Sequence, residues 1–243
     1  MKKTVTVLAC TPCKEILPPN DEVEVLYTDE NRTAHEILEN GLKQARSKYI
    51  ILTDGGFEIT DLPPLLDVLR GSSSDIVTFI GGAAVKSGLF KGALKGDVDK
   101  FTTEFFAVLG AKSIESTNLN PFTFNKAPCF YEGDDAERLK SVLDEFKKCK
   151  ARLPKDVFTY AFDLLCERLI IFYTAALIAV HKGEIPAETL KEFDLKLKQN
   201  IVLYIAMQKR FKAANLQKLR EKNFKINFLT CNKLKKSLNG KNN

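Results

Sequence analysis

The first 80 residues alternate between short apolar runs and stretches in which apolar residues recur at helical spacing. Runs rich in β-branched and large apolar side chains predict strands at residues 4–9, 22–27, 49–53 and 75–80. Residues 34–48 carry apolar side chains on one helical face, and residues 61–71 carry a shorter stripe that includes Pro63 and Pro64. Because parallel strands need helical crossovers, the order strand, strand, helix, strand, helix, strand predicts an α/β sheet.

Both of these helices begin with a capping signal. Thr33 and Glu36 have the spacing of a capping box, in which each side chain accepts a hydrogen bond from a free backbone N–H group. Asp61 stands where the N-cap of the second helix is expected. We therefore expect a side-chain cap at the start of each helix.

The pattern weakens between residues 83 and 128 and becomes helical after it. Residues 105–109 fit a strand or a helix, and residues 120–124 fit a short strand. From Asp134 onward, one helix is predicted by an apolar stripe made of Leu139, Val142, Leu143 and Phe146. A second helix is predicted to run from Pro154 to about Val180.

A third helix is predicted after Ile185 and Pro186 by the apolar residues Leu190, Phe193, Leu197, Ile201 and Tyr204. The last two helices are joined by a short turn that contains Gly183, which is typical of an αα-hairpin. We therefore predict an α/β domain over residues 1–130 and a helical C-terminal region over residues 131–243.

The net charge of +6 is unevenly distributed along the chain. Residues 182–243 hold 15 Lys and Arg against 5 Asp and Glu, whereas residues 1–181 hold 22 against 26. The acidic front part argues against nucleic-acid binding by the whole molecule. The basic end predicts either a solvated lysine-rich helix end or a surface that binds an acidic protein or an anionic membrane.

Composition and cysteine spacing favour a cytoplasmic protein with reduced thiols. The chain is 44% hydrophobic and 28% charged, as soluble globular proteins are. Pro12 interrupts the start before an apolar signal segment could form, and the apolar run at residues 169–180 is too short to span a bilayer. Cys10 and Cys13 follow a strand with the spacing of a redox pair, but two prolines replace the helix that would lower a thiol pKa.

Acidic residues follow two of the predicted strands. Asp29 and Glu30 follow the second strand, and Asp54 follows the third in the stretch YIILTDGGFEI. The carboxyl ends of parallel strands meet at one edge, where α/β sheets bind ligands, and the Thr11–Pro12 loop leaves the first strand at this edge. A carboxylate there suits a hard cation such as Mg²⁺ or Mn²⁺ that carries a diphosphate. The sequence Asp-Gly-Gly is also typical of a tight turn. Asp54 can therefore be interpreted either as a metal-binding carboxylate or as a turn residue.

Together, the segments VEVLYTDEN and NGLKQARSKYIILTDGG resemble the nucleotide-binding half of glycosyltransferase family 2, whose members have the GT-A fold. The resemblance covers about residues 1–130 and implies a mostly parallel GT-A-like sheet with flanking helices. It implies that Asp29 or Glu30 contacts the nucleotide base and that the Thr11–Pro12 loop brackets the nucleotide. Asp54 would be the first acid of the family's Asp-x-Asp metal motif.

The chain departs from this family at positions that matter for catalysis. Gly56 replaces the second acid of Asp-x-Asp, which is a principal metal ligand in the family, and Glu58 or Asp61 would have to substitute for it. The catalytic base, normally an acid before a helix, has Asp134 and Asp135 as candidates, and these residues also suit a plain helix N-cap.

The resemblance implies an inverting transfer of a sugar from a nucleotide-sugar to an unknown acceptor, assisted by a divalent metal, Mn or Mg. An acid would deprotonate the acceptor hydroxyl, which then attacks the anomeric carbon while the nucleoside diphosphate departs. The alternative is a non-catalytic relative that kept the fold and acts as a binding or scaffolding protein.

Overall fold

The computed structural model describes residues 3–9, 20–26, 34–53, 57–90, 92–93, 99–124 and 135–186, together with single residues and short pairs between 188 and 206. The chain divides into two compact units. The first unit comprises Met1–Pro128 and Val142–Ala161, and the second comprises Cys129–Ser141 and Phe162–Asn243. The predicted boundary near residue 130 stays a prediction.

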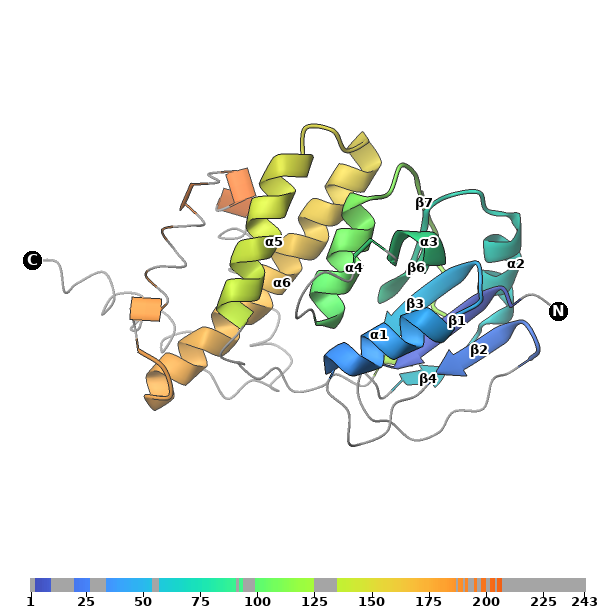
Figure 1. Ribbon diagram of the computed structural model, residues 1–243, viewed down its shortest axis with the longest axis horizontal. Coiled ribbons are helices and arrows are strands. Elements are labelled where there is room, and N and C mark those ends of the chain that lie inside the picture. The colour runs from blue at the N-terminus through green and yellow to red at the C-terminus, as the bar shows by residue number, and fades with distance from the viewer. Residues whose placement is uncertain are drawn as a thin grey trace, which may run out of the picture. The chain divides into compact units, whose positions relative to one another are not determined.

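The first unit is an α/β domain built on a mixed, mostly parallel sheet (Figure 1). The strands are β1 (Val5–Ala9), β2 (Val23–Leu26), β3 (Tyr49–Thr53), β4 (Phe57–Ile59), β5 (Ile76–Phe79), β6 (Gly82–Lys86), β7 (Ile114–Ser116) and β8 (Phe122–Phe124). The helices described along the chain are α1 (Ala34–Gln44), α2 (Pro63–Gly71), α3 (Ser87–Phe90), α4 (Lys100–Leu109), α5 (Asp135–Cys149) and α6 (Lys155–Lys182).

Strand order in the main sheet is β2-β1-β3-β6-β5-β7. β1 pairs in parallel with β2 and β3, and β5 pairs in parallel with β7. β6 runs antiparallel to both of its neighbours, so β5 points in the same direction as β3. β4 and β8 form a separate antiparallel pair. The predicted α/β class is thus confirmed at the level of a mostly parallel sheet with helices.

The sequence patterns predicted five of these strands, including β8 within the short strand expected at residues 120–124, and missed others. β1, β2, β3 and β5 lie within the predicted strands, whereas β6 was not predicted. Residues 105–109 belong to helix α4, whose N-cap Asp99 accepts a hydrogen bond from the Thr102 N–H group at 2.7 Å. Thr33 lies outside the described residues, so its capping box stays a prediction.

The prediction that Asp61 caps α2 is wrong. The N-cap is Leu62, and no side chain makes a cap hydrogen bond there. Pro63 and Pro64 occupy the first turn and have no N–H group, so the first turn has fewer donors that need a side-chain acceptor.

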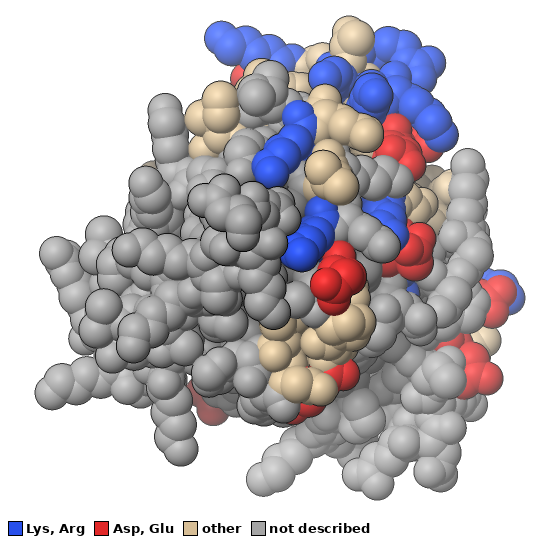
Figure 2. Space-filling model, turned by 90° about the vertical axis from the view of Figure 1, so that its left-hand side faces the viewer, with Lys and Arg blue, Asp and Glu red and all other residues tan. Residues whose placement is uncertain are grey.

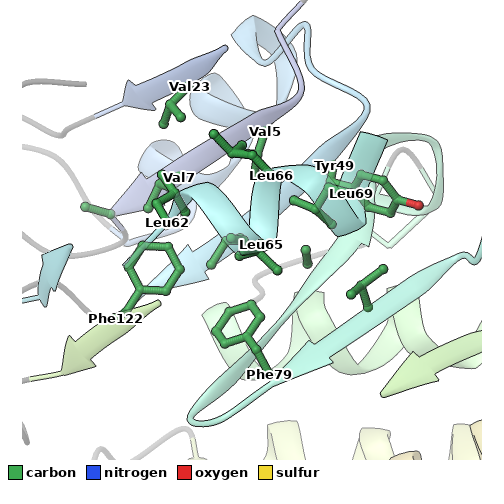
Figure 3. Close-up of a cluster of buried hydrophobic side chains, with 14 residues drawn as sticks. Val5, Val7, Val23, Tyr49, Leu62, Leu65, Leu66, Leu69, Phe79 and Phe122 are labelled. Atoms are coloured by element: carbon green, nitrogen blue, oxygen red, sulfur yellow. The ribbon is translucent and has the colours of Figure 1, made fainter. Parts of the chain in front are cut away.

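One face of the sheet is covered by α2, as Figure 3 shows. Alternate residues of β1 and β3, including Val5, Val7, Tyr49 and Ile51, point to this face because side chains along a strand alternate between faces. The buried leucines of α2 pack on them, and Phe79 and Phe122 join the cluster with ring centroids 5.6 Å apart. The remaining members are Val23, Leu62, Leu65, Leu66, Leu69, Val77, Ala9 and Ala84.

A polar network fixes the end of α2 near the start of β3. The Lys48 Nζ atom donates to the Leu69 carbonyl at 3.1 Å and to the Ser72 carbonyl at 2.6 Å. The buried Tyr49 hydroxyl donates to the Ser74 carbonyl at 2.8 Å. These donors satisfy carbonyl groups that a helix end and the following loop leave unpaired, and they hold α2 against the sheet.

The first two helices predicted after residue 134 are found as α5 and α6, whereas the third, predicted after Ile185 and Pro186, lies mostly outside the described residues and stays a prediction. Leu139, Val142, Leu143 and Phe146 are all buried, which confirms the predicted stripe of α5. Within the first unit, the ring centroid of Phe146 lies 6.1 Å from that of Phe105 in α4 and 5.8 Å from that of Phe158 in α6. In the part of the chain that the structure describes, no helix is both long enough and apolar enough to cross a membrane.

Candidate functional site

Three parallel strands bring their carboxyl ends to one edge of the sheet. β1 lies between β2 and β3, with Leu8 in register with Leu26 and Leu52, and Ala9 in register with Thr53. The segments that follow these strands therefore leave the sheet close together. They contain all of the nucleotide and metal residues that the sequence predicts.

The chain leaves β1 and β3 toward opposite sides of the sheet. From β1 it continues to β2 on one side, and from β3 it continues through β4 and α2 to β5 on the other side. Open α/β sheets bind ligands outside the carboxyl ends of strands where the strand order reverses in this way. We call this place, outside Ala9 and Thr53, the switch-point edge, and it is the candidate site.

The predicted site residues follow directly on the strand ends but lie outside the described residues. Asp54 is bonded to Thr53, the Thr11–Pro12 pair begins two residues after Ala9, and Asp29 and Glu30 come three and four residues after Leu26. Their roles stay predictions.

The two candidates for the catalytic base belong to the second unit. Asp134 lies outside the described residues. Asp135 is the first residue of α5, and the structure describes its backbone only. Both residues are in the segment Cys129–Ser141. The choice between a base and a helix cap therefore stays open.

Thr53 is a polar residue at the switch-point edge that sequence patterns counted only as part of an apolar strand. Its side chain is buried, with 1% exposed, and Oγ1 has no hydrogen-bond partner among the described residues. A buried hydroxyl without a partner costs about 1–3 kcal/mol, which a ligand oxygen or a water molecule can offset. Its position next to Asp54 could have suggested a polar role, because Thr53 is the only residue of the run YIILT with a short hydroxyl side chain.

Glu58 and Asp61, the acids considered as replacements for the missing second metal ligand, are both exposed. Glu58 lies on β4 opposite Thr123 of β8, so it belongs to the small sheet. Within the described ranges, no group of three or more His, Cys, Asp or Glu side chains is arranged to hold a metal ion. The carboxylate oxygens of Asp54 would be ligands of the kind that Mn²⁺ or Mg²⁺ prefers.

A tight turn between β5 and β6 lies at the same edge of the sheet. Because β5 runs in the direction of β3, the turn residues Ile80 and Gly81 follow a carboxyl strand end. Gly81 has a φ of +89°, which a side chain would strain, and the Ile80 N–H group donates to the Leu119 carbonyl at 2.8 Å. This turn gives the edge a fixed rim, which the sequence pattern does not predict because the predicted strand ends at residue 80 and β6 is not expected after it.

Comparison with known proteins gives no relative from which a function could be transferred. No protein-family model matches the chain, and no curated protein sequence is significantly similar to it.

Proposed function

We propose that this chain is a divergent GT-A-like protein that binds a nucleotide-sugar at the switch-point edge and transfers the sugar to an acceptor with inversion. The observation that carries the proposal is the reversal of strand order between β1 and β3, with Asp54 bonded to the last residue of β3. The mostly parallel sheet, its flanking helices and the resemblance of residues 1–130 to glycosyltransferase family 2 support the same conclusion.

Residues that follow the carboxyl ends of β1, β2 and β3 would hold the nucleotide. Asp29 or Glu30 would accept hydrogen bonds from the base, and the Thr11–Pro12 loop would flank the nucleotide. Gly55 and Gly56 have no side chains, so a diphosphate could approach the backbone closely there. The unpartnered Thr53 hydroxyl is a donor of the kind that a phosphate oxygen accepts.

The chemistry requires a base and support for the leaving group. Asp134 or Asp135 would take the proton of the acceptor hydroxyl as its oxygen attacks the anomeric carbon. The bond from that carbon to the diphosphate breaks, and the nucleoside diphosphate leaves. A divalent cation bound by Asp54 would supply positive charge to the departing diphosphate. With Gly56 in place of a second acid, this support is weaker than in the family.

A second candidate function follows from Gly56 itself. A chain that retains the sheet edge but lacks one metal ligand could bind a nucleotide without transferring the sugar, and would then act as a binding or scaffolding protein. The two functions differ in whether a bound nucleotide-sugar is turned over.

A thermal-shift screen of nucleoside diphosphates and nucleotide-sugars, with Mn²⁺ or with a chelator, tests the proposal. At tenfold excess over its dissociation constant, a specific ligand should raise the melting temperature by about 3 °C or more in the presence of Mn²⁺. Free nucleoside diphosphate released from a stabilising nucleotide-sugar distinguishes transfer or hydrolysis from binding alone. No stabilisation by any nucleotide would contradict both transfer and nucleotide binding, and would leave the scaffolding function.

A further inference from the structure

The turn between α5 and α6 carries a dense group of exposed basic side chains. Five of the nine residues from 147 to 155 are basic, and none is acidic. Figure 2 shows Lys and Arg side chains gathered at the top of the view, which is the height at which Figure 1 draws this turn. All five are exposed, and we call them the basic turn: Lys147, Lys148, Lys150, Arg152 and Lys155.

Most of the positive charge of the basic turn is not neutralised by neighbouring acids. The Lys148 Nζ atom lies 3.2 Å from a carboxylate oxygen of Glu145. Within the described ranges of the chain, the other four basic side chains form no ion pair with an Asp or Glu carboxylate. These cations therefore remain available to an anionic partner.

Helix stability explains only part of this group. Lys147 and Lys148 lie in the last turn of α5, where a cation interacts favourably with the negative end of the helix dipole. Lys155 is the first residue of α6, where the helix dipole disfavours a cation. Lys150 and Arg152 lie between the two helices. A role in helix stability therefore does not account for a group of cations that continues from one helix into the next.

Packing beneath the basic turn holds it in place. The Phe146 and Phe158 rings are stacked, with centroids 5.8 Å apart and planes 23° apart. Phe146 and Val157 are buried on either side of the turn. The Arg152 backbone N–H group donates to the Cys149 carbonyl at 2.9 Å. The cations are therefore held close together before any partner binds, so little ordering of the backbone opposes binding.

Apolar residues lie among the cations of the turn. Ala151 and Pro154 are exposed, and Leu153 is partly exposed. A nucleic-acid backbone offers no apolar contact to these residues, and the flanking rings of Phe146 and Phe158 stack on each other, which leaves bases without a stacking surface there. The interface of an anionic bilayer suits both features, because its headgroups attract cations and its acyl boundary accepts apolar side chains.

We propose that the basic turn, together with Ala151, Leu153 and Pro154, docks this protein on the surface of an anionic phospholipid bilayer. Each Lys or Arg close to an anionic surface strengthens binding about fivefold, so five of them together give a reversible and measurable attachment. An acidic protein would need carboxylates placed to match this turn, whereas mobile lipid headgroups can gather around it. The proposal uses no residue of the switch-point edge and is independent of sugar transfer.

Sedimentation of the full-length protein with vesicles of phosphatidylcholine that contain about a third phosphatidylglycerol measures this docking. The parent should bind these vesicles, should bind pure phosphatidylcholine at least about tenfold more weakly, and should be released as salt rises. The double variant Lys150→Gln, Arg152→Gln should weaken binding about 25-fold, because it removes two of the cations. The control Lys43→Gln, Lys191→Gln removes two exposed lysines elsewhere and should bind like the parent.

A fluorescent probe reports whether the turn itself meets the bilayer. The chain has no tryptophan, so Ala151→Trp places a single one among the cations. Its emission should move to shorter wavelength when anionic vesicles are added, because the indole ring enters a less polar environment, and should not change with pure phosphatidylcholine. Unchanged emission with anionic vesicles would overturn the proposal.

Three results of the binding measurements would also overturn it. The first is failure of the parent to bind anionic vesicles. The second is equal binding by the parent and the Lys150→Gln, Arg152→Gln variant, which would assign the attachment to other basic residues. The third is tighter binding to a single-stranded oligonucleotide than to vesicles at the same salt, lost in this double variant, which would assign the basic turn to a nucleic acid.

Discussion

Asp75, at the start of β5, shows how single residues hold the sheet together. One carboxylate oxygen accepts from Lys86 Nζ at 2.9 Å, and the other accepts from the Lys112 backbone N–H group at 2.8 Å. Burial raises the pKa of Asp75, but these two hydrogen bonds and the charges of Lys86 and Lys112 outweigh it, so the pKa lies below its ordinary value of 3.8. The carboxylate therefore connects β5 to its neighbour β6 and to the segment before β7.

The lowered pKa gives a prediction with a definite sign. The unfolded chain binds a proton at Asp75 more readily than the folded chain, so the contribution is fully present above about pH 4 to 5 and is lost as pH falls through the folded-state pKa. Asp75→Asn should lower the free energy of unfolding at pH 7 by about 1–2 kcal/mol and should reduce the loss of stability below about pH 4.

Urea unfolding at several pH values measures this effect. Asp67→Asn is the matched control, because Asp67 is an exposed carboxylate on α2 whose partner, Arg70, is also exposed. Its effect should be within about 0.5 kcal/mol of zero. An Asp75→Asn protein with the stability and acid sensitivity of the parent would contradict the role given to Asp75.

At the scale of elements, the contact between α1 and β1 depends on a glycine. A Cβ atom added at Gly41 would lie 2.4 Å from Leu8 Cδ1, and Leu8 is buried in the sheet. Gly71, at the end of α2, has open space around the corresponding position. Replacing each of the two glycines by alanine therefore distinguishes the effect of close packing on stability from the general effect of removing a glycine from a helix.

Gly41→Ala and Gly71→Ala should change stability in opposite directions. Alanine gains about 1 kcal/mol over glycine inside a helix, but overpacking a core costs about 1–3 kcal/mol, so Gly41→Ala should destabilise by about 1 kcal/mol. Gly71→Ala should stabilise by about 0.5 kcal/mol. Denaturant unfolding of both variants tests the packing of α1 on β1. If Gly41→Ala is as stable as Gly71→Ala, this packing is wrong.

Strand positions were predictable from sequence where local patterns are strong, and strand order was not. The run at residues 49–53 is apolar throughout and became the buried strand β3, as expected. In β6, Ala83, Ala84 and Val85 lie between Gly82 and Lys86, and only Val85 favours a strand. This weak signal still gives a strand because the Ile80–Gly81 turn lets β6 pair with β5. Its place between β3 and β5 depends on contacts between residues far apart in sequence, which periodicity does not reveal.

At the scale of the whole molecule, the first unit contains the last part of α5 and the first part of α6 as well as the α/β domain. The Phe105, Phe146 and Phe158 rings link α4, α5 and α6 inside the first unit, so this unit includes residues after the predicted boundary near 130. The boundary near residue 130 is predicted from the point at which strand signals end in the sequence. The aromatic contacts join segments on both sides of that point, and no local sequence pattern predicts these contacts.

The candidate site was predictable only in part. Acids after the second and third strands could be assigned to one edge because parallel strands share their carboxyl ends, and the observed register of β1, β2 and β3 agrees with that. Thr53 was missed because its hydroxyl is informative only once burial and the lack of a partner are known. The roles of Asp54, Asp29 and Glu30 depend on a ligand and stay predictions.

The central claim is that Asp54 is a metal-side carboxylate at the switch-point edge rather than a turn residue alone. Titration calorimetry with UDP and Mn²⁺ on the parent, Asp54→Asn and the surface control Asp67→Asn tests it most directly. The parent and the control should bind with a dissociation constant of about 0.1 to 1 mM, because only one acid of the metal motif remains, and Asp54→Asn should bind at least about tenfold more weakly with an unchanged circular dichroism spectrum. Equal binding by all three proteins, or no nucleotide binding by the parent, would contradict the claim and leave Asp54 as part of a turn.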